Sequence, residues 1–268
     1  MRECRPVASE TVLHDYGGEG APILLLHGLM GRSGTWRRQL PWLRRHGHVW
    51  AVDTAGHGGT SSAGPWTTER FVADAAAALR ELDHGPVVAI GHSMGALHAW
   101  CLAAEYPALV RALVIEDMAP DFRGRTAVGW LAQFESWPLP FPDAAAVLDF
   151  FGPVAGRYFL ESFDQRADGW HLHGALENWF AIAEHWGARD HWEQWQAVRV
   201  PALLLEAELS ITPPGQMAQM AAMANAPCTH LVVPGAGHLL HDDAPDAYRA
   251  AVEAFLGELS AAEPSEAG

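Results

Sequence analysis

The sequence predicts an α/β fold in which helices cover a mostly parallel central sheet and a helical cap interrupts the domain. Two observations predict it. Short apolar runs rich in Leu, Val and Ile alternate with longer helical patterns, which is typical of a sheet buried on both faces. That alternation stops between Pro120 and Val198, where seven of the twelve tryptophans lie. With 49% apolar residues among 268, the chain can bury a complete core.

Four strands are predicted before the interruption, each ending in a loop of small or polar residues. They are APILLLHG (21–28), HVWAVDTAGHG (48–58), GPVVAIGHS (85–93) and VRALVIEDMAP (110–120). The helical pattern TTERFVADAAAALREL precedes the third strand, and MGALHAWCLAAEYP precedes the fourth. Because strands joined by helices run parallel, the loops that follow these strands should meet at one edge of the sheet.

The interrupting segment, 120–198, is predicted to be a helical cap without a convincing strand. Its clearest helix is HLHGALENWFAIAEHW, where apolar side chains recur at helical spacing. The alternation resumes with the strand VPALLLEAE, a helix in PPGQMAQMAAMA, the strand CTHLVVPG and a last helix in APDAYRAAVEAFLGEL. The predicted domains are a core of residues 1–119 and 199–258, the cap, and a disordered polar tail, 259–268.

Composition argues against several classes of function. The formal charge is −15, and every basic residue is an arginine. Without lysine, the chain has neither a Schiff-base nucleophile nor the lysine of a phosphate-binding loop. An acidic chain is also a poor ligand for nucleic acids and anionic membranes. Three widely spaced cysteines suggest neither a disulfide framework nor a metal site.

The N-terminal residues lack the apolar middle of a signal peptide, and no apolar run approaches the roughly 18 residues of a spanning helix. We therefore expect a cytoplasmic protein, monomeric or homodimeric, that binds neither nucleic acid nor membrane. Its expected partner is a small-molecule substrate, and we expect neither a cofactor nor a metal.

A candidate nucleophile, Ser93, lies in GHSMG, where the strand PVVAI turns into a helix. A sharp strand–turn–helix exposes the serine Oγ at the sheet edge, and glycines two residues before and after it relieve the crowding. The Met94 N–H, at the helix N-terminus, is the first expected donor of an oxyanion hole. The second should come from LLLHGLMG, where the Leu29 N–H is favoured over that of Met30.

The predicted base is His238, in GAGHLLHDDAP, because the chain order Ser–acid–His places the histidine late. Its loop follows a predicted strand and should face the same sheet edge as Ser93. His241, three residues later, is the weaker alternative, and His27 is expected to be a packed loop residue. The remaining histidines, including His171, His173, His185 and His191 in the cap, favour structural or surface roles over metal binding, since no carboxylate or cysteine repeats at ligand spacing.

Four motifs, HGLMG, DTAGHGGTS, GHSMG and GAGHLLHDDAP, together resemble the α/β-hydrolase superfamily across essentially the whole chain. The resemblance implies a serine-nucleophile, esterase-like enzyme with a helical cap. It also reveals a departure, because many relatives carry the triad acid where this chain has Leu209 or Ser210. Some relatives carry an aspartate after the preceding core strand instead, and Asp117 in LVIEDMAP fits that position. Asp117 is therefore the predicted acid, with Glu208 as the alternative; the remaining alternatives are Glu116 and the absence of a functional acid.

The aromatic cap suggests an apolar or aromatic substrate. Most cap tryptophans are expected to bury the cap against the core, and a few to line the pocket. Arg123, Arg125 and Arg157 are either partners for a substrate carboxylate or solvated surface residues. The predicted pocket residues are Met30, Trp36, Trp130, Trp137, Trp179 and Leu239.

The predicted reaction is hydrolysis of a carboxylic ester, thioester or lactone through an acyl-enzyme. Ser93 argues against the dehalogenases and epoxide hydrolases of the superfamily, which use an aspartate nucleophile. Leu239 stands where carbon–carbon hydrolases usually have a tryptophan after the histidine. The alternatives left open are a non-catalytic, receptor-like binder, a carbon–carbon hydrolase, a lyase and a cofactor-free haloperoxidase.

Overall fold

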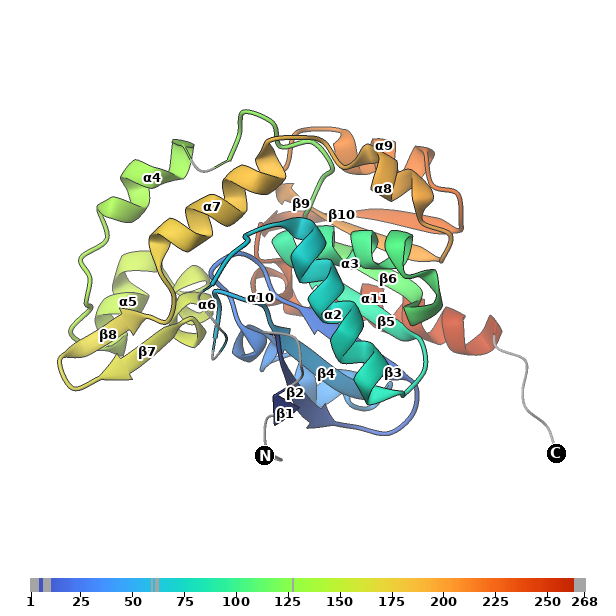
Figure 1. Cartoon of the computed structure of the whole chain (residues 1–268), viewed down its shortest axis with the longest axis horizontal. Coiled ribbons are helices and arrows are strands. Elements are labelled where there is room, and N and C mark those ends of the chain that lie inside the picture. The colour runs from blue at the N-terminus through green and yellow to red at the C-terminus, as the bar shows by residue number, and fades with distance from the viewer. Residues whose placement is uncertain (1–4, 7–10, 59, 61–62, 127, 263–268) are drawn as a thin grey trace.

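The computed structural model describes residues 5–6, 11–58, 60, 63–126 and 128–262, and its centre is an eight-stranded sheet (Figure 1). The strand order is β1-β2-β4-β3-β5-β6-β9-β10, antiparallel at the β1–β2–β4 edge and parallel elsewhere. The predicted α/β fold is confirmed. The strands are β1 (Arg5–Pro6), β2 (Val12–Gly17), β3 (Pro22–Leu26), β4 (His48–Asp53), β5 (Val87–His92), β6 (Val110–Glu116), β9 (Ala202–Leu209) and β10 (Cys228–Gly237).

Helices cover both faces of this sheet, because its strands are apolar on both sides. In β3, Leu24 and Leu26 pack toward α2 and α3, whereas Ile23 and Leu25 pack toward α1 and α11. This two-sided burial explains the continuous apolar runs in the sequence. The core helices are α1 (Leu40–Leu43), α2 (Thr68–Leu82), α3 (Met94–Glu105), α9 (Gln216–Ala222), α10 (Leu240–Asp243) and α11 (Pro245–Ala262), with short 3₁₀ turns η1 (Ser33–Trp36) and η2 (Pro107–Leu109).

In the described part of the segment between β6 and β9 (residues 117–126 and 128–201), the chain forms five helices and one hairpin, most of which lie at the left of the sheet in Figure 1. The expectation of no strand in this segment is wrong. The two strands of the hairpin, FDQR and GWHL, are four residues long and mix polar with apolar residues, so the sequence shows no apolar run there. The elements are α4 (Val128–Glu135), α5 (Ala144–Phe151), α6 (Ala155–Glu161), β7 (Phe163–Arg166), β8 (Gly169–Leu172), α7 (Leu176–Gly187) and α8 (Trp192–Ala197).

The prediction that a disordered tail begins at residue 259 is wrong. Helix α11 continues through Ala262, so residues 259–262 are helical, and residues 263–268 lie outside the described residues. Ser260 and the two alanines after it remain compatible with a helix, and the Ser260 Oγ–H donates to the Leu256 carbonyl at 3.0 Å.

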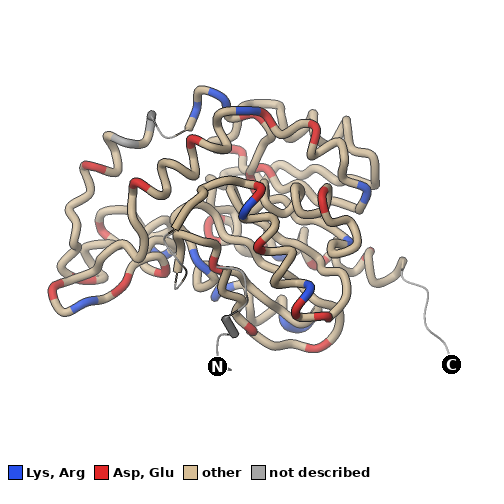
Figure 2. The backbone as a smooth tube through the Cα atoms, in the orientation of Figure 1, with Lys and Arg blue, Asp and Glu red and all other residues tan. Residues whose placement is uncertain are grey.

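Acidic residues are distributed along the whole described chain, with arginines among them (Figure 2). Cys101 and Cys228 carry free thiols, and Cys4 lies outside the described residues. Among the described helices, none is long and apolar enough to cross a bilayer.

Several histidines lose proton affinity because they are buried in the core. Burial lowers the pKa of His27, His57, His92 and His98, and that of His98 falls to about 3. His98, on α3, packs against Phe71 of α2 with ring centroids 5.0 Å apart. In mildly acidic solution these side chains bind fewer protons in the folded chain than in the unfolded chain.

The pH dependence of stability should change when His98 is replaced. A lowered histidine pKa contributes stability that is fully present above the unfolded pKa of about 6.5 and is lost as the pH falls below it. In His98→Leu, the free energy of unfolding should therefore fall less steeply between about pH 6 and pH 4, by about 1.4 kcal/mol per pH unit. Urea unfolding of both proteins across this range measures the two slopes. Parallel slopes would contradict the expectation.

Candidate active site

Ser93 lies between β5 and α3 in a left-handed backbone conformation, with φ 52° and ψ −123°. Its N–H donates to the Glu116 carbonyl at 2.9 Å, which ties the turn to β6. A Cβ on Gly91 would overlap the Gly95 carbonyl, and a Cβ on Gly95 would overlap the Leu26 carbonyl. The two glycines are therefore required by close backbone contacts, which allow α3 to begin immediately after the serine.

Backbone strain is concentrated around this serine. Among the described non-glycine residues, four have positive φ: Met30 (66°), Asp83 (50°), Ser93 (52°) and Asp117 (46°). Asp83 only terminates α2, whereas the other three carry predicted site functions. Such conformations cost of order 1–3 kcal/mol each and persist where the surrounding structure enforces them, often at functional sites.

The structure brings Asp117 and His238 together. His238 Nδ1–H donates to the fully buried Asp117 carboxylate at 2.7 Å, across 121 residues of chain. The same carboxylate accepts hydrogen bonds from the Ala207 N–H at 2.9 Å and the Ser210 Oγ–H at 3.0 Å. With its Nδ1 proton committed to Asp117, the neutral His238 ring has an unprotonated Nε2, the form a general base requires.

The other two candidate acids have different partners. Glu208 is exposed, and its carboxylate accepts the Gly235 N–H at 2.7 Å. Leu209 and Ser210 occupy the usual acid position; Leu209 is exposed, but Ser210 donates to Asp117. Ser210, at the position where many relatives carry the acid, thus hydrogen-bonds to Asp117, a contact that the sequence pattern did not indicate.

Glu116 forms a second carboxylate–histidine pair beside the first. Its Oε1 accepts the His241 N–H at 3.1 Å and the His241 Nδ1–H at 2.7 Å, and both side chains are buried. Burial is the largest single influence on His241 and acts to lower its pKa, but the charge and hydrogen bond of Glu116, together with the charge of Asp242, outweigh it, so the pKa is raised. His92 also donates, through Nε2–H, to the His238 carbonyl at 3.0 Å. Sequence reasoning missed these contacts, which fasten the loop of His238 to β5 and β6.

Ser93 and His238 line one cavity of about 370 Å³, a volume typical of small-molecule sites. Its walls come from the loop after β3, the ends of β5 and β10, the loop after β9, and the cap helices α4, α6 and α7. The lining residues are Leu29, Met30, His92, Ser93, Trp130, Gln133, Phe134, Tyr158, Phe159, Trp186, Ile211, His238 and Leu239.

Three predicted pocket residues lie elsewhere. Trp36 is fully buried on the opposite face of the sheet, stacked on His241 at 4.7 Å. Trp137 follows the end of α4 and packs inside the cap against Phe151 at 4.8 Å. Trp179 packs on His57, and its Nε1–H donates to the Gly56 carbonyl at 3.1 Å. Closeness in sequence to the predicted site motifs does not predict which tryptophans line the pocket. The direction of each ring depends on where its helix ends and on which face of the sheet it packs.

Apart from His92, at the end of β5, the pocket residues that sequence reasoning missed come from the cap or the loop after β9. Phe134 follows Trp130 at a spacing of four on α4, which is the signal that could have found it. Tyr158, Phe159 and Ile211 carried no comparable signal. The side chains of Arg123, Arg125 and Arg157 are exposed, and none of them lines this cavity. No group of three His, Cys, Asp or Glu side chains in the described ranges is arranged to hold a metal.

The two predicted oxyanion donors lie at the start of α3 and in the loop after β3. Met94 is the first residue of α3, so its N–H has no partner within the helix. Within the described part of the chain, neither the Met94 N–H nor the Leu29 N–H donates to a protein acceptor. His27, in contrast, is a packed loop residue: its Nδ1–H donates to the Gly28 carbonyl at 2.8 Å.

The sequence profile of the "Alpha/beta hydrolase family" matches residues 23–251, from β3 into α11. The chain belongs to the alpha/beta hydrolase family. The match covers the serine turn, the loop of Asp117 and the loop of His238.

Relatives within the alpha/beta hydrolase family differ in their reactions. The 2-(acetamidomethylene)succinate hydrolase of Mesorhizobium japonicum is 26% identical over 89% of this chain and 89% of its own length. The crystal structure of an E-2-(acetamidomethylene)succinate hydrolase superimposes with a TM-score of 0.79 at 23% identity, covering 92% of this chain and 95% of that one. The putative non-heme bromoperoxidase BpoC of Mycobacterium tuberculosis is 26% identical over 92% of this chain and 98% of its length.

A shorter match has higher identity. Lipase LipV of Mycobacterium tuberculosis is 40% identical over 113 residues, which are 41% of this chain and 42% of the lipase. The chain thus matches less than half the length of that relative. Family membership supports an enzyme with the alpha/beta hydrolase fold, and the names of these relatives point to different reactions.

Proposed function

We propose that the chain is a serine hydrolase that cleaves the carboxylic ester, thioester or lactone bond of a small, neutral, apolar or aromatic substrate. One observation carries this proposal. The buried Asp117 carboxylate holds His238 at 2.7 Å, and His238 shares an apolar cavity with the strained Ser93.

In the first half of the reaction, Ser93 Oγ attacks the carbonyl carbon while its proton passes to His238 Nε2. Asp117 stabilises the imidazolium that forms. The Leu29 and Met94 N–H groups stabilise the negative oxygen of the tetrahedral intermediate. His238 then gives its proton to the leaving alcohol or thiol, and the acyl group remains on Ser93.

Water completes the cycle. It gives a proton to His238 Nε2 as it attacks the acyl carbon, and the second tetrahedral intermediate collapses to release a carboxylic acid. The proton returns from His238 to Ser93 Oγ. For a lactone the leaving alkoxide stays attached to the acyl chain, and a hydroxy acid is released.

The cavity lining supports a neutral substrate. It is built from aliphatic and aromatic side chains around Ser93 and His238, with Gln133 as its amide. None of the described residues that line it is an arginine, so a substrate carboxylate buried there would be unpaired at a cost of several kcal/mol. The succinate hydrolase relative acts, by its name, on a compound that carries carboxylates. We therefore propose a different substrate class for this chain.

A non-catalytic binder explains the site less well. The left-handed backbones of Ser93 and Asp117 each cost free energy, and a binding pocket of apolar residues needs neither of them. Likewise, a buried carboxylate with three hydrogen-bond donors is useful for stabilising an imidazolium.

Two nitrophenyl esters with acyl chains of equal length test the proposal. 4-Nitrophenyl butyrate is neutral, and 4-nitrophenyl hemisuccinate carries a carboxylate in place of the terminal methyl group. We expect kcat/KM for the butyrate to be larger by at least about 100-fold, which corresponds to roughly 2.7 kcal/mol of unpaired-charge penalty. A fluorophosphonate should label the wild-type chain at Ser93.

Two results would count against it in different ways. A hemisuccinate rate equal to the butyrate rate would overturn the neutral-substrate claim alone. Failure to hydrolyse either ester, together with no fluorophosphonate labelling of Ser93, would overturn the serine-hydrolase claim as a whole.

A further inference from the structure

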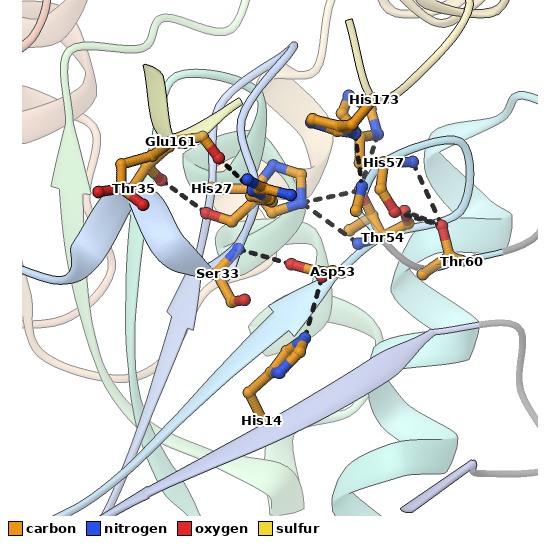
Figure 3. Close-up of polar contacts among 12 residues, drawn as sticks. His14, His27, Ser33, Thr35, Asp53, Thr54, His57, Thr60, Glu161 and His173 are labelled. Carbon is orange, nitrogen blue, oxygen red and sulfur yellow. Dashed lines mark hydrogen bonds and ion pairs between the residues drawn. The ribbon is translucent and has the colours of Figure 1, made fainter. Parts of the chain in front are cut away.

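Two buried histidines, His27 and His57, contact the loop that carries the Leu29 N–H, and Figure 3 shows both of them beside Thr54. His27 Nδ1–H donates to the Gly28 carbonyl at 2.8 Å, and its Nε2 accepts the Thr54 N–H at 3.2 Å. His57, from the loop after β4, accepts the Met30 N–H on its Nε2 at 3.2 Å. Residues 28–30 are thus held on both sides of the Leu29 peptide group.

His57 is suited to accept this hydrogen bond because of its own neighbours. Its Nδ1 lies 3.2 Å from the Ala55 carbonyl, which only accepts, so Nδ1 carries the proton and Nε2 is the acceptor. Burial lowers the pKa of His57 well below its ordinary value, so the ring stays neutral near neutral pH. A protonated ring would present two donors and could not accept the Met30 N–H.

The cap holds the segment that contains His57. Trp179, on α7, donates its Nε1–H to the Gly56 carbonyl at 3.1 Å. His173, between β8 and α7, accepts the Gly58 N–H on Nδ1 at 2.9 Å. The Trp179 ring also stacks on the His57 ring, with centroids 5.7 Å apart and an interplanar angle of 23°. A short chain of contacts therefore runs from the cap through Gly56–Gly58 to the Met30 N–H.

We infer that His57 is a positioning residue for the oxyanion hole and that the cap, through His173 and Trp179, keeps it in place. This inference rests on the proposed function. With the Met30 N–H committed to His57 and Met30 itself left-handed at φ 66°, the preceding Leu29 N–H is left to serve the oxyanion. The cap thereby contributes to transition-state stabilisation as well as to the pocket wall.

The size of the expected effect follows from oxyanion-hole chemistry. Removing one donor outright costs about 10²–10³ in kcat in other hydrolases, and misplacing one costs less. His57→Leu keeps the bulk but removes the acceptor, so kcat should fall by about 10–100-fold while KM changes by less than about threefold. In His57→Gln the amide Oε1 can replace Nε2, so kcat should stay within about fivefold of wild type.

Two further measurements separate positioning from general stability. The inhibition constant of a boronic acid, whose adduct with Ser93 places an oxygen in the oxyanion hole, should rise in parallel with the loss of kcat. Hydrogen exchange of a peptide spanning residues 26–32 should be faster in His57→Leu than in wild type, and this readout does not depend on ester hydrolysis.

Two matched variants test the contact between Trp179 of the cap and Gly56. Trp179→Phe removes the N–H that reaches Gly56, and kcat should fall by about 3–10-fold. Trp195→Phe removes an equivalent buried bond, from Trp195 Nε1–H to the Met220 carbonyl at 2.8 Å, away from the loop of His57. Both changes should cost similar stability, but Trp195→Phe should leave kcat unchanged.

The outcomes are distinguishable. Faster exchange in His57→Leu with unchanged kcat would overturn the oxyanion role alone, and unchanged exchange would overturn the loop-holding contact. Equal kcat losses in Trp179→Phe and Trp195→Phe would remove the cap from the inference. A wild-type chain inactive on every ester would overturn the proposed function, and the oxyanion role with it.

Discussion

Replacing Ser93 with alanine should abolish ester hydrolysis, with kcat falling by about 10⁶-fold, as for nucleophile loss in other serine hydrolases. The remaining rate would come from the oxyanion donors and substrate binding. The fold should survive, because alanine tolerates the left-handed turn at this position about as well as serine does. Single-turnover and steady-state kinetics with 4-nitrophenyl butyrate measure the loss.

The Ser93→Ala chain should still bind the substrate. The apolar lining of the cavity is untouched, so equilibrium binding of the butyrate ester should change by less than about threefold. Fluorophosphonate labelling should disappear. If Ser93→Ala retained more than about 1% of wild-type turnover, another nucleophile would have to carry the reaction.

Asp117→Asn should lower kcat by about 10⁴-fold, the loss found when the acid of a comparable triad is changed to its amide. Three donors converge on this carboxylate: the His238 Nδ1–H, the Ala207 N–H and the Ser210 Oγ–H. An asparagine offers one acceptor oxygen and an NH₂ group, so the NH₂ must face a donor or the His238 tautomer must change. Either outcome leaves His238 without its catalytic form. Steady-state kinetics measure the loss, and circular dichroism checks the fold.

Glu208→Gln is the matched control. The Glu208 carboxylate is exposed and bonds to the Gly235 N–H, so this change should alter kcat by less than about threefold. Ser210→Ala is an intermediate case, because it removes one of the three donors to Asp117 and should cost about 3–10-fold. If kcat fell strongly in Glu208→Gln and only slightly in Asp117→Asn, Glu208 on β9 would be the catalytic acid instead of Asp117.

The sequence predicts those features that depend on residues close together in the chain. The strands β3 to β6 show as apolar runs because both of their faces are buried. The turn at Ser93 shows because its close backbone contacts allow only glycine at positions 91 and 95. Three of the residues that the sequence predicts for the pocket line the cavity: Met30, Trp130 and Leu239.

The sequence does not predict features that depend on where a helix ends or on which side of the sheet an aromatic ring packs. Trp36 was expected in the pocket because it follows the loop of Leu29, yet η1 turns its ring toward the opposite face. Trp137 lies two residues beyond the end of α4 and therefore points into the cap. The sequence does not predict the β7–β8 hairpin, because its four-residue strands of mixed polarity are too short to show an alternation of apolar and polar residues.

The amino-acid order established the fold class, the serine turn and a short set of candidate acids, since each of these rests on local spacing and on the chemistry of single residues. Among Asp117, Glu208 and Glu116, the sequence favours Asp117 only through the resemblance of LVIEDMAP to some family members. The contacts themselves depend on packing, because Asp117 meets His238 across 121 positions and Glu116 meets His241 across 125. The parallel pairings β6–β9 and β9–β10 bring the loops of these residues together, and the substrate cavity likewise exists only once the cap packs above them.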